Sequence, residues 1–127
     1  DRNKIHQKFL GRCSFCGEIL QDSSGKFMQI DHLIPLRRNW WENSCMNPEN
    51  ETYENLYPSC PKCNNLKHSL SLESFRNTIK DTIRQLEISS TYQRAVRFGM
   101  IEIKEWDGLF YFERITAVQH TNKLIKD

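Results

Sequence analysis

The spacing of apolar and polar residues along this chain predicts a mixed α+β fold. Ile5 and Phe9 recur at helical spacing within residues 2–10. Residues 27–34 are rich in apolar and β-branched side chains and stop at a proline, which predicts a strand. Residues 55–60 predict a second strand, and a helix is expected to start at residue 64 and reach residue 70.

The second half of the chain is predicted to be helical before it returns to strand. Ser71 can cap a helix over 72–86, whose apolar stripe consists of Leu72, Phe75, Ile79, Ile83 and Leu86. A short amphipathic helix is expected over 91–98, followed by Gly99.

Residues 100–114 alternate between apolar and polar around Asp107-Gly108, the pattern of a C-terminal β-hairpin with a tight turn. We expect this hairpin to pack on the 72–86 helix or to form an edge for a dimer. The tail, residues 116–127, is expected to be frayed or weakly helical.

Length and composition favour one globular domain over residues 1–127. Of the 127 residues, 38% are hydrophobic and 27% are charged, which excludes a disordered chain. Neither a membrane-spanning run nor a signal-peptide segment is visible, so we expect no membrane partner and a cytoplasmic location. The net charge of +2 says little about partners, but residues 61–97 hold seven Lys/Arg against three Asp/Glu, which allows a basic face there.

Five cysteines narrow the chemistry. Four form two pairs at metal-ligand spacing, Cys13-x-x-Cys16 and Cys60-x-x-Cys63. An odd count without a secretory signal argues against a disulfide framework, and a second pair downstream argues against a redox motif. We therefore predict one structural Zn²⁺ held by four thiolates, and we interpret Cys45 as an ordinary thiol.

A second candidate site combines oxygen and nitrogen ligands. Asp31 and Asn64 offer hard oxygens suited to Mg²⁺ or Mn²⁺, and the imidazole of His32 can accept a proton near neutral pH. Asp31 and His32 would point to opposite faces of a regular strand, so both can serve one site only if the strand twists, bulges or ends at His32. Asn64 and His68 are four residues apart and share a helix face. These groups suit metal-assisted phosphodiester hydrolysis.

Two further groups of basic residues are candidates for nucleic-acid binding. Arg37 and Arg38 precede Trp40 and Trp41 in a long loop over 36–53, and arginines beside aromatic rings can hold a backbone and stack on bases. The tryptophans could equally cover a small core. Arg76 and Lys80 lie opposite the apolar stripe of the 72–86 helix, where they form either a solvated face or a phosphate-binding one.

In combination, the two cysteine pairs, the Asp31-His32 pair, Asn55-Leu56 and the Asn64-x-x-Lys67 spacing resemble the HNH endonucleases. This family is also called the His-Me finger or ββα-metal family, and the likeness is to its zinc-stapled subgroup. The resemblance covers about residues 12–70. It implies a ββα-metal finger with structural zinc there, followed by a helical and hairpin extension over 71–115 and a tail over 116–127.

The resemblance also implies a role for each matching residue. His32 would be the general base, Asp31 and Asn64 the ligands of the catalytic divalent ion, and Asn55 the brace of the loop that carries the base. Lys67 would lie near the scissile phosphate or the loop backbone, and His68 stands where some members carry an additional metal ligand.

We therefore expect a metal-dependent endonuclease acting on DNA, with a structural Zn²⁺ and a catalytic Mg²⁺ or Mn²⁺. The alternatives are a zinc-ribbon module that binds nucleic acid without cutting it and a zinc-stapled interaction protein. One such site cuts one strand, so a double-strand break would need a homodimer, a state that the sequence leaves open.

Overall fold

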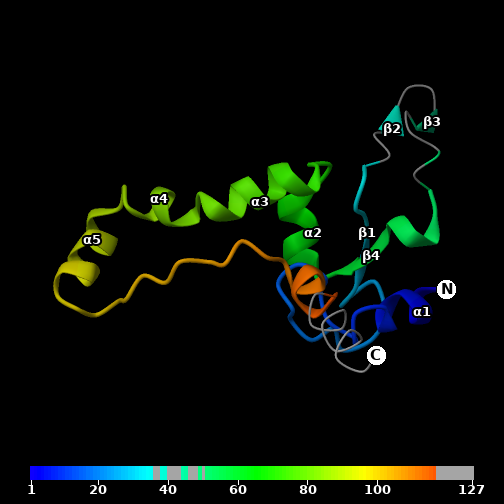
Figure 1. Ribbon diagram of the computed structural model, residues 1–127, viewed down its shortest axis with the longest axis horizontal. Helices are drawn as coiled ribbons and strands as arrows, with labels where there is room; N and C mark the ends of the chain where they lie inside the picture. Colours follow the sequence, from blue (N-terminus) through cyan, green and yellow to red (C-terminus); the bar gives the residue numbers. More distant parts are fainter. Residues whose placement is uncertain (36–37, 40–43, 46–48, 50, 117–127) are drawn as a thin grey trace, which may run out of the picture.

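Two antiparallel strands and a helix form the centre of the fold. The computed structural model describes residues 1–35, 38–39, 44–45, 49 and 51–116, with 38–39 and 44–45 described as backbone (Figure 1). Strand β1 (Gln29–His32) pairs with β4 (Leu56–Ser59), so that Asp31 lies opposite Tyr57 and His32 opposite Leu56. Helix α2 (Pro61–Lys67) follows β4 and packs on β1. The predicted α+β class and ββα finger are confirmed.

The segment between β1 and β4 contains a small ladder of its own. Strands β2 (Arg38–Asn39) and β3 (Ser44–Cys45) pair antiparallel, and the 3-10 turn η2 (Tyr53–Asn55) leads into β4. Arg37, Trp40 and Trp41 lie outside the described residues, as do the side chains of Arg38 and Cys45. The predicted long loop therefore includes short strands, and its proposed nucleic-acid contacts stay predictions.

Aromatic rings from three segments build the core. Phe15 meets Phe75 and Phe110 edge to face, and these two rings stack on each other with centroids 5.1 Å apart. All three are at most 5% exposed. Aromatic pairs prefer edge-to-face and offset arrangements of this kind. Because Phe15 belongs to the cysteine turn at residues 13–17, the core holds this turn against elements from the second half of the chain.

Helix α1 (Arg2–Gln7) covers β4 at the N-terminal side of the body, with Asp1 accepting a hydrogen bond from the backbone N–H of Asn3 at its start. Its buried residue is Ile5, whose spacing from Phe9 predicted this helix. Phe9 follows the helix and lies against the ring of Tyr57 on β4. The apolar side of α1 and its C-terminal end therefore pack on β4.

The predicted helix over 72–86 forms as two helices, α3 (Leu72–Lys80) and α4 (Thr82–Leu86). Ser71 caps α3 as predicted, accepting a hydrogen bond from the N–H of Ser74. The first half of the apolar stripe reaches the core and Leu86 is 41% exposed. Helix α5 (Ser90–Arg97) follows. Within the described residues, every helix falls short of the length and apolar character needed to cross a bilayer.

The predicted C-terminal hairpin is wrong. Residues 101–107 form no strand, and residues 111–116 are helical. The Asp-Gly turn does form, with Asp107 accepting from the N–H of Leu109, but Glu113 then accepts from the N–H of Phe110 and begins a helix. Glu113 is held there by Arg76 of α3, a long-range partner that the local alternation of residues does not reveal.

Candidate active site and zinc centre

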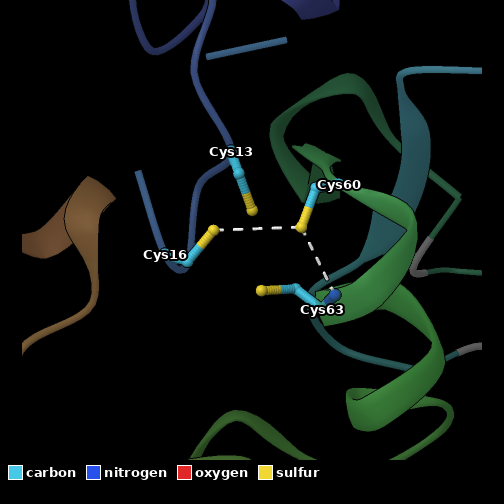
Figure 2. A group of neighbouring side chains, drawn as sticks. All are labelled: Cys13, Cys16, Cys60 and Cys63. Atoms are coloured by element: carbon cyan, nitrogen blue, oxygen red, sulfur yellow. Dashed lines mark hydrogen bonds between the residues drawn. The ribbon is translucent and has the colours of Figure 1, made fainter. Parts of the chain in front are cut away.

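The four paired cysteines meet at one point. Their sulfur atoms lie within 4.8 Å of one another, and Figure 2 shows them converging from the turn at Cys13 and Cys16 and from the start of α2 at Cys60 and Cys63. A tetrahedral zinc with Zn–S bonds of about 2.3 Å requires sulfurs roughly 3.8 Å apart. The Cys16 and Cys60 sulfurs are 3.8 Å apart. The four cysteines are therefore positioned to bind one zinc ion.

Local backbone geometry aims these sulfurs. Cys60 is the N-cap of α2, its sulfur accepts from the N–H of Cys63, and Pro61 occupies the first helical turn. In the other pair, Gly17 adopts φ +80°, and a side chain there would press on the ring of Tyr111. Gly17 is thus required both by its left-handed backbone and by the close ring.

The thiols also perturb each other's ionisation. Hydrogen bonds from Cys16 and then Cys63 lower the pKa of Cys13, whereas the hydrogen bond to Cys13 raises the pKa of Cys16 to about 12. The pKa of Cys63 is raised for the same reason, first by Cys13. Sulfurs packed this closely need a cation if all four are to be thiolates, which is what zinc supplies.

Beside the zinc centre, β1 and α2 are joined by a buried ion pair. Lys67 Nζ lies 3.0 Å from Asp31 Oδ2, and the side chains are 0% and 4% exposed. The ammonium is also 3.5 Å from the carbonyl oxygens of His32 and Leu33. Lys67 thus reaches both the carboxylate and the loop backbone that follows β1.

Two opposing effects act on the ionisation of Asp31. Burial raises its pKa, and the nearby charge of Lys67 opposes that rise. The Lys67 contact is a charge contact, and within the described residues Oδ2 accepts no hydrogen bond of ordinary geometry. This oxygen therefore faces the Lys67 ammonium, and a carboxylate is a ligand type that hard divalent ions prefer.

His32 is the last residue of β1, which ends before Leu33 and so meets one of the conditions for Asp31 and His32 to serve the same site. Its Nε2 lies 3.0 Å from a carboxylate oxygen of Glu51, and its side chain is 23% exposed. A proton on Nε2, donated to Glu51, leaves Nδ1 as an acceptor.

Asn55 holds the loop that follows His32. Its Oδ1 accepts from the N–H of Ile34 at 2.8 Å, its Nδ2 donates to the carbonyl of Ile34 at 2.9 Å, and its backbone carbonyl accepts from Leu33. The side chain is largely buried. These bonds fix the chain direction where β1 ends.

Lys8 supports Asn55 from the other side. Its ammonium donates to the carbonyls of Tyr53, Glu54 and Leu56, which surround Asn55 in sequence, and lies over the ring of Tyr57. Burial lowers the pKa of Lys8, against the charge of Glu54. Sequence reasoning missed both Lys8 and Glu51, because each lies far along the chain from its partners and at no diagnostic spacing.

Asn64 and His68, both predicted as metal ligands, differ in their position relative to helix α2. Asn64 is half-buried on α2, three residues before Lys67, and therefore on the helix face that Lys67 directs toward Asp31. His68 comes after the last helical residue with φ 51°, is exposed, and pairs with the hydroxyl of Ser69. Asn64 thus shares the face of α2 that approaches Asp31, whereas His68 lies beyond the end of the helix, and both ligand roles stay predictions.

The two residues of α3 predicted to contact phosphate, Arg76 and Lys80, have different surroundings. Arg76 is 9% exposed and donates to Glu73, Glu113 and the carbonyl of Gly108, and the hydrogen bonds to Glu113 contribute most to its raised pKa. Its guanidinium is committed to the fold, which argues against the predicted phosphate contact. Lys80 is exposed at the end of α3.

A β-strand pair, a helix and a four-cysteine zinc site define the ββα-metal class of zinc-stapled fingers. The HNH endonuclease family model matches residues 13–70, which contain all of these features. This segment therefore belongs to the HNH endonuclease family, in the subgroup with two Cys-x-x-Cys pairs. Searches of curated proteins and of solved structures found no match.

Proposed function

We propose that this protein is a metal-dependent endonuclease that hydrolyses DNA phosphodiester bonds at the end of β1. One observation carries the proposal: groups from three separate segments converge there. Lys67 contacts the Asp31 carboxylate, and Glu51 contacts the His32 ring. The side chain of Asn55 hydrogen-bonds the backbone of Ile34, in the loop that follows β1. Membership of residues 13–70 in the HNH family supports the reaction type.

In this proposal His32 is the general base. With Nε2–H directed to Glu51, Nδ1 can take the proton of an attacking water. Asn55 fixes the position of the ring by holding the peptide of Ile34, two residues after the base. Catalysis of this kind depends on placing the acceptor within hydrogen-bond reach of the water, so the brace is part of the machinery.

Asp31 and Asn64 would hold the catalytic Mg²⁺ or Mn²⁺ through one carboxylate and one amide oxygen. When bound, such an ion neutralises charge on the phosphate and on the leaving oxygen. Lys67 balances the buried charge of Asp31 and places a further positive group beside the same carboxylate. We propose Lys80, Arg37 and Arg38 as contacts to the DNA backbone, which is the main source of affinity for nucleic acid.

The proposal is tested by incubating plasmid DNA with zinc-loaded protein in the presence and absence of Mg²⁺. Omitting Mg²⁺, rather than adding a chelator, keeps the zinc site filled. We expect cleavage only with Mg²⁺, and His32→Ala should lower the rate by about 10²–10⁴-fold while zinc content stays the same.

His68→Ala is the matched control, because His68 is exposed and its hydrogen bond is local. It should cleave at close to the wild-type rate. DNA that is bound but left intact under all conditions would refute the proposal and indicate a non-catalytic zinc-ribbon module instead.

A further inference from the structure

Residues 81–105, which we call the arm, project from the body of the protein. Figure 1 shows α4 and α5 extending beyond α3, away from β1 and β4, with the following segment running back to the body. None of residues 81–105 is buried, and the core resumes at Phe110. The arm thus has no core of its own.

The arm nevertheless carries large apolar side chains. Seven of them are between 36% and 79% exposed: Leu86, Ile88, Val96, Phe98, Met100, Ile101 and Ile103. Together they present on the order of several hundred Å² of apolar surface, close to the scale of one side of an ordinary protein interface, about 800 Å². Helices of five and eight residues are also far below the roughly 12–15 residues that isolated helices need. The arm requires a covering surface.

Charge indicates what kind of surface covers it. Residues 81–105 contain four Lys/Arg and four Asp/Glu, so the arm is neutral. A neutral apolar surface is unsuited to DNA, whose affinity for proteins depends on phosphate neutralisation. The composition fits a protein partner.

The distribution of these charges is self-complementary. Arg94 and Arg97 lie on α5, whereas Glu102 and Glu105 lie on the returning segment, and within the described part of the chain none of the four forms an ion pair. At the base of the arm, by contrast, Arg84 is paired with Asp81. Two arms related by a two-fold axis would place each basic helix against the acidic segment of the other copy.

We propose that the arm is a dimerisation surface whose partner is a second copy of this chain. The two arms lie antiparallel, with Phe98, Met100 and their apolar neighbours at the centre and the two charge pairs at the ends. This arrangement buries the apolar residues of both copies in one interface and pairs the four free charges of each.

The first test measures the mass of the full zinc-loaded chain by sedimentation velocity between about 1 and 100 µM, the range in which an interface of this size associates. We expect a dimer. Phe98→Glu should weaken association at least tenfold, a change of about 1.4 kcal/mol. Ile19→Glu is the matched control, because Ile19 is 63% and Phe98 66% exposed, but Ile19 lies outside the arm. A wild-type protein that stays monomeric, or equal effects of both variants, would overturn the proposal.

The second test reverses charges. A variant with Arg94→Glu and Arg97→Glu and another with Glu102→Arg and Glu105→Arg should each be monomeric, because like charges then face each other. An equimolar mixture should form a mixed dimer, because each altered segment meets its complement. Zinc content and circular dichroism report folding of each variant. A mixture that remains monomeric, or variants that change DNA binding but not mass, would contradict a self-association surface.

Discussion

At the scale of single residues, the buried Asp31–Lys67 pair is the most consequential contact. Both side chains are removed from water, and neither is tolerable there without the other. The pair ties the strand that ends in His32 to the helix that carries Asn64. We therefore interpret Lys67 as a residue that holds the site together as well as one that shapes its charge.

Lys67→Met should destabilise the zinc-loaded protein by about 3–5 kcal/mol, because it leaves the Asp31 carboxylate buried without its counter-charge. Combining it with Asp31→Leu should recover most of this loss, because no charge then remains buried. Lys62→Met on the same helix is the control, since Lys62 is exposed and should change stability by less than about 0.5 kcal/mol. Urea unfolding measures all four proteins, and equal stability of Lys67→Met and Lys62→Met would contradict this role.

At the scale of elements, a polar clamp attaches the second half of the chain to the finger beside the aromatic core. Arg76 of α3 reaches Glu113 in the helical residues 111–116, while the N–H groups of Tyr111 and Phe112 donate to the carbonyls of Phe15 and Ser14. Arg76 also lies over the ring of Phe110. The clamp therefore holds the aromatic core closed over the cysteine turn.

Glu113 makes this clamp sensitive to acid. The hydrogen bonds from Arg76 hold the pKa of Glu113 below the usual range of a glutamate. A carboxyl whose pKa is depressed by folding stabilises the folded state above its unfolded pKa, and this stabilisation is lost as the pH falls through the lower, folded value. Glu113→Gln should thus lower the free energy of unfolding by about 1–2 kcal/mol near pH 7. The loss should become progressively smaller below about pH 4.

Thermal unfolding from pH 7 to pH 3 measures the difference in stability between Glu113→Gln and the wild type at each pH. Both proteins carry the same cysteine site, so its pH dependence cancels in this difference. Glu87→Gln, an exposed carboxyl on the arm, should show no such trend. A difference that stays constant with pH would show that the carboxylate charge of Glu113 is not what Arg76 uses.

At the scale of the whole molecule, the protein consists of a zinc-stapled body and an arm without a core. The zinc site joins residues 13–16 to residues 60–63, across the two strands of the finger. Its closure places the carbonyls of Ser14 and Phe15 where residues 111–112 bind. Zinc should therefore stabilise the whole body and not the cysteine turn alone.

Removing zinc with 1,10-phenanthroline should abolish the cooperative melt, because the binding free energy of structural zinc, about 10–16 kcal/mol in finger peptides, is folding free energy. Added Zn²⁺ should restore the melt and Mg²⁺ should not. Cys60→Ser should behave like the chelated protein, and Cys45→Ser should keep one zinc per chain. Zinc content and far-UV circular dichroism provide the readouts. A chelated protein that still melts cooperatively would refute the staple.

The sequence by itself determined the parts that depend on local spacing. Two Cys-x-x-Cys turns specify the zinc ligands, since the chain must wrap so that both sulfurs of each pair reach one ion. The N-cap at Ser71 was predictable for the same reason, because caps act over a few residues. The strand and the helix of the finger were predictable in kind but not in their bounds. Strand β1 ends at His32, three residues before Pro35, and helix α2 covers Pro61–Lys67 rather than residues 64–70.

Tertiary structure decided what depends on contacts between distant segments. The alternation at 109–114 predicted a strand, yet the contacts of Glu113 with Arg76 and of Phe110 with Phe75 stabilise a helix there. The sequence made Arg76 a candidate phosphate contact, but the fold pairs its guanidinium with Glu73 and Glu113. No local pattern in the sequence pointed to Glu51 or Lys8. Local pattern encodes the preference of a segment, but the partner of a buried or charged side chain is chosen by the fold, because the free energy of burial depends on what lies opposite.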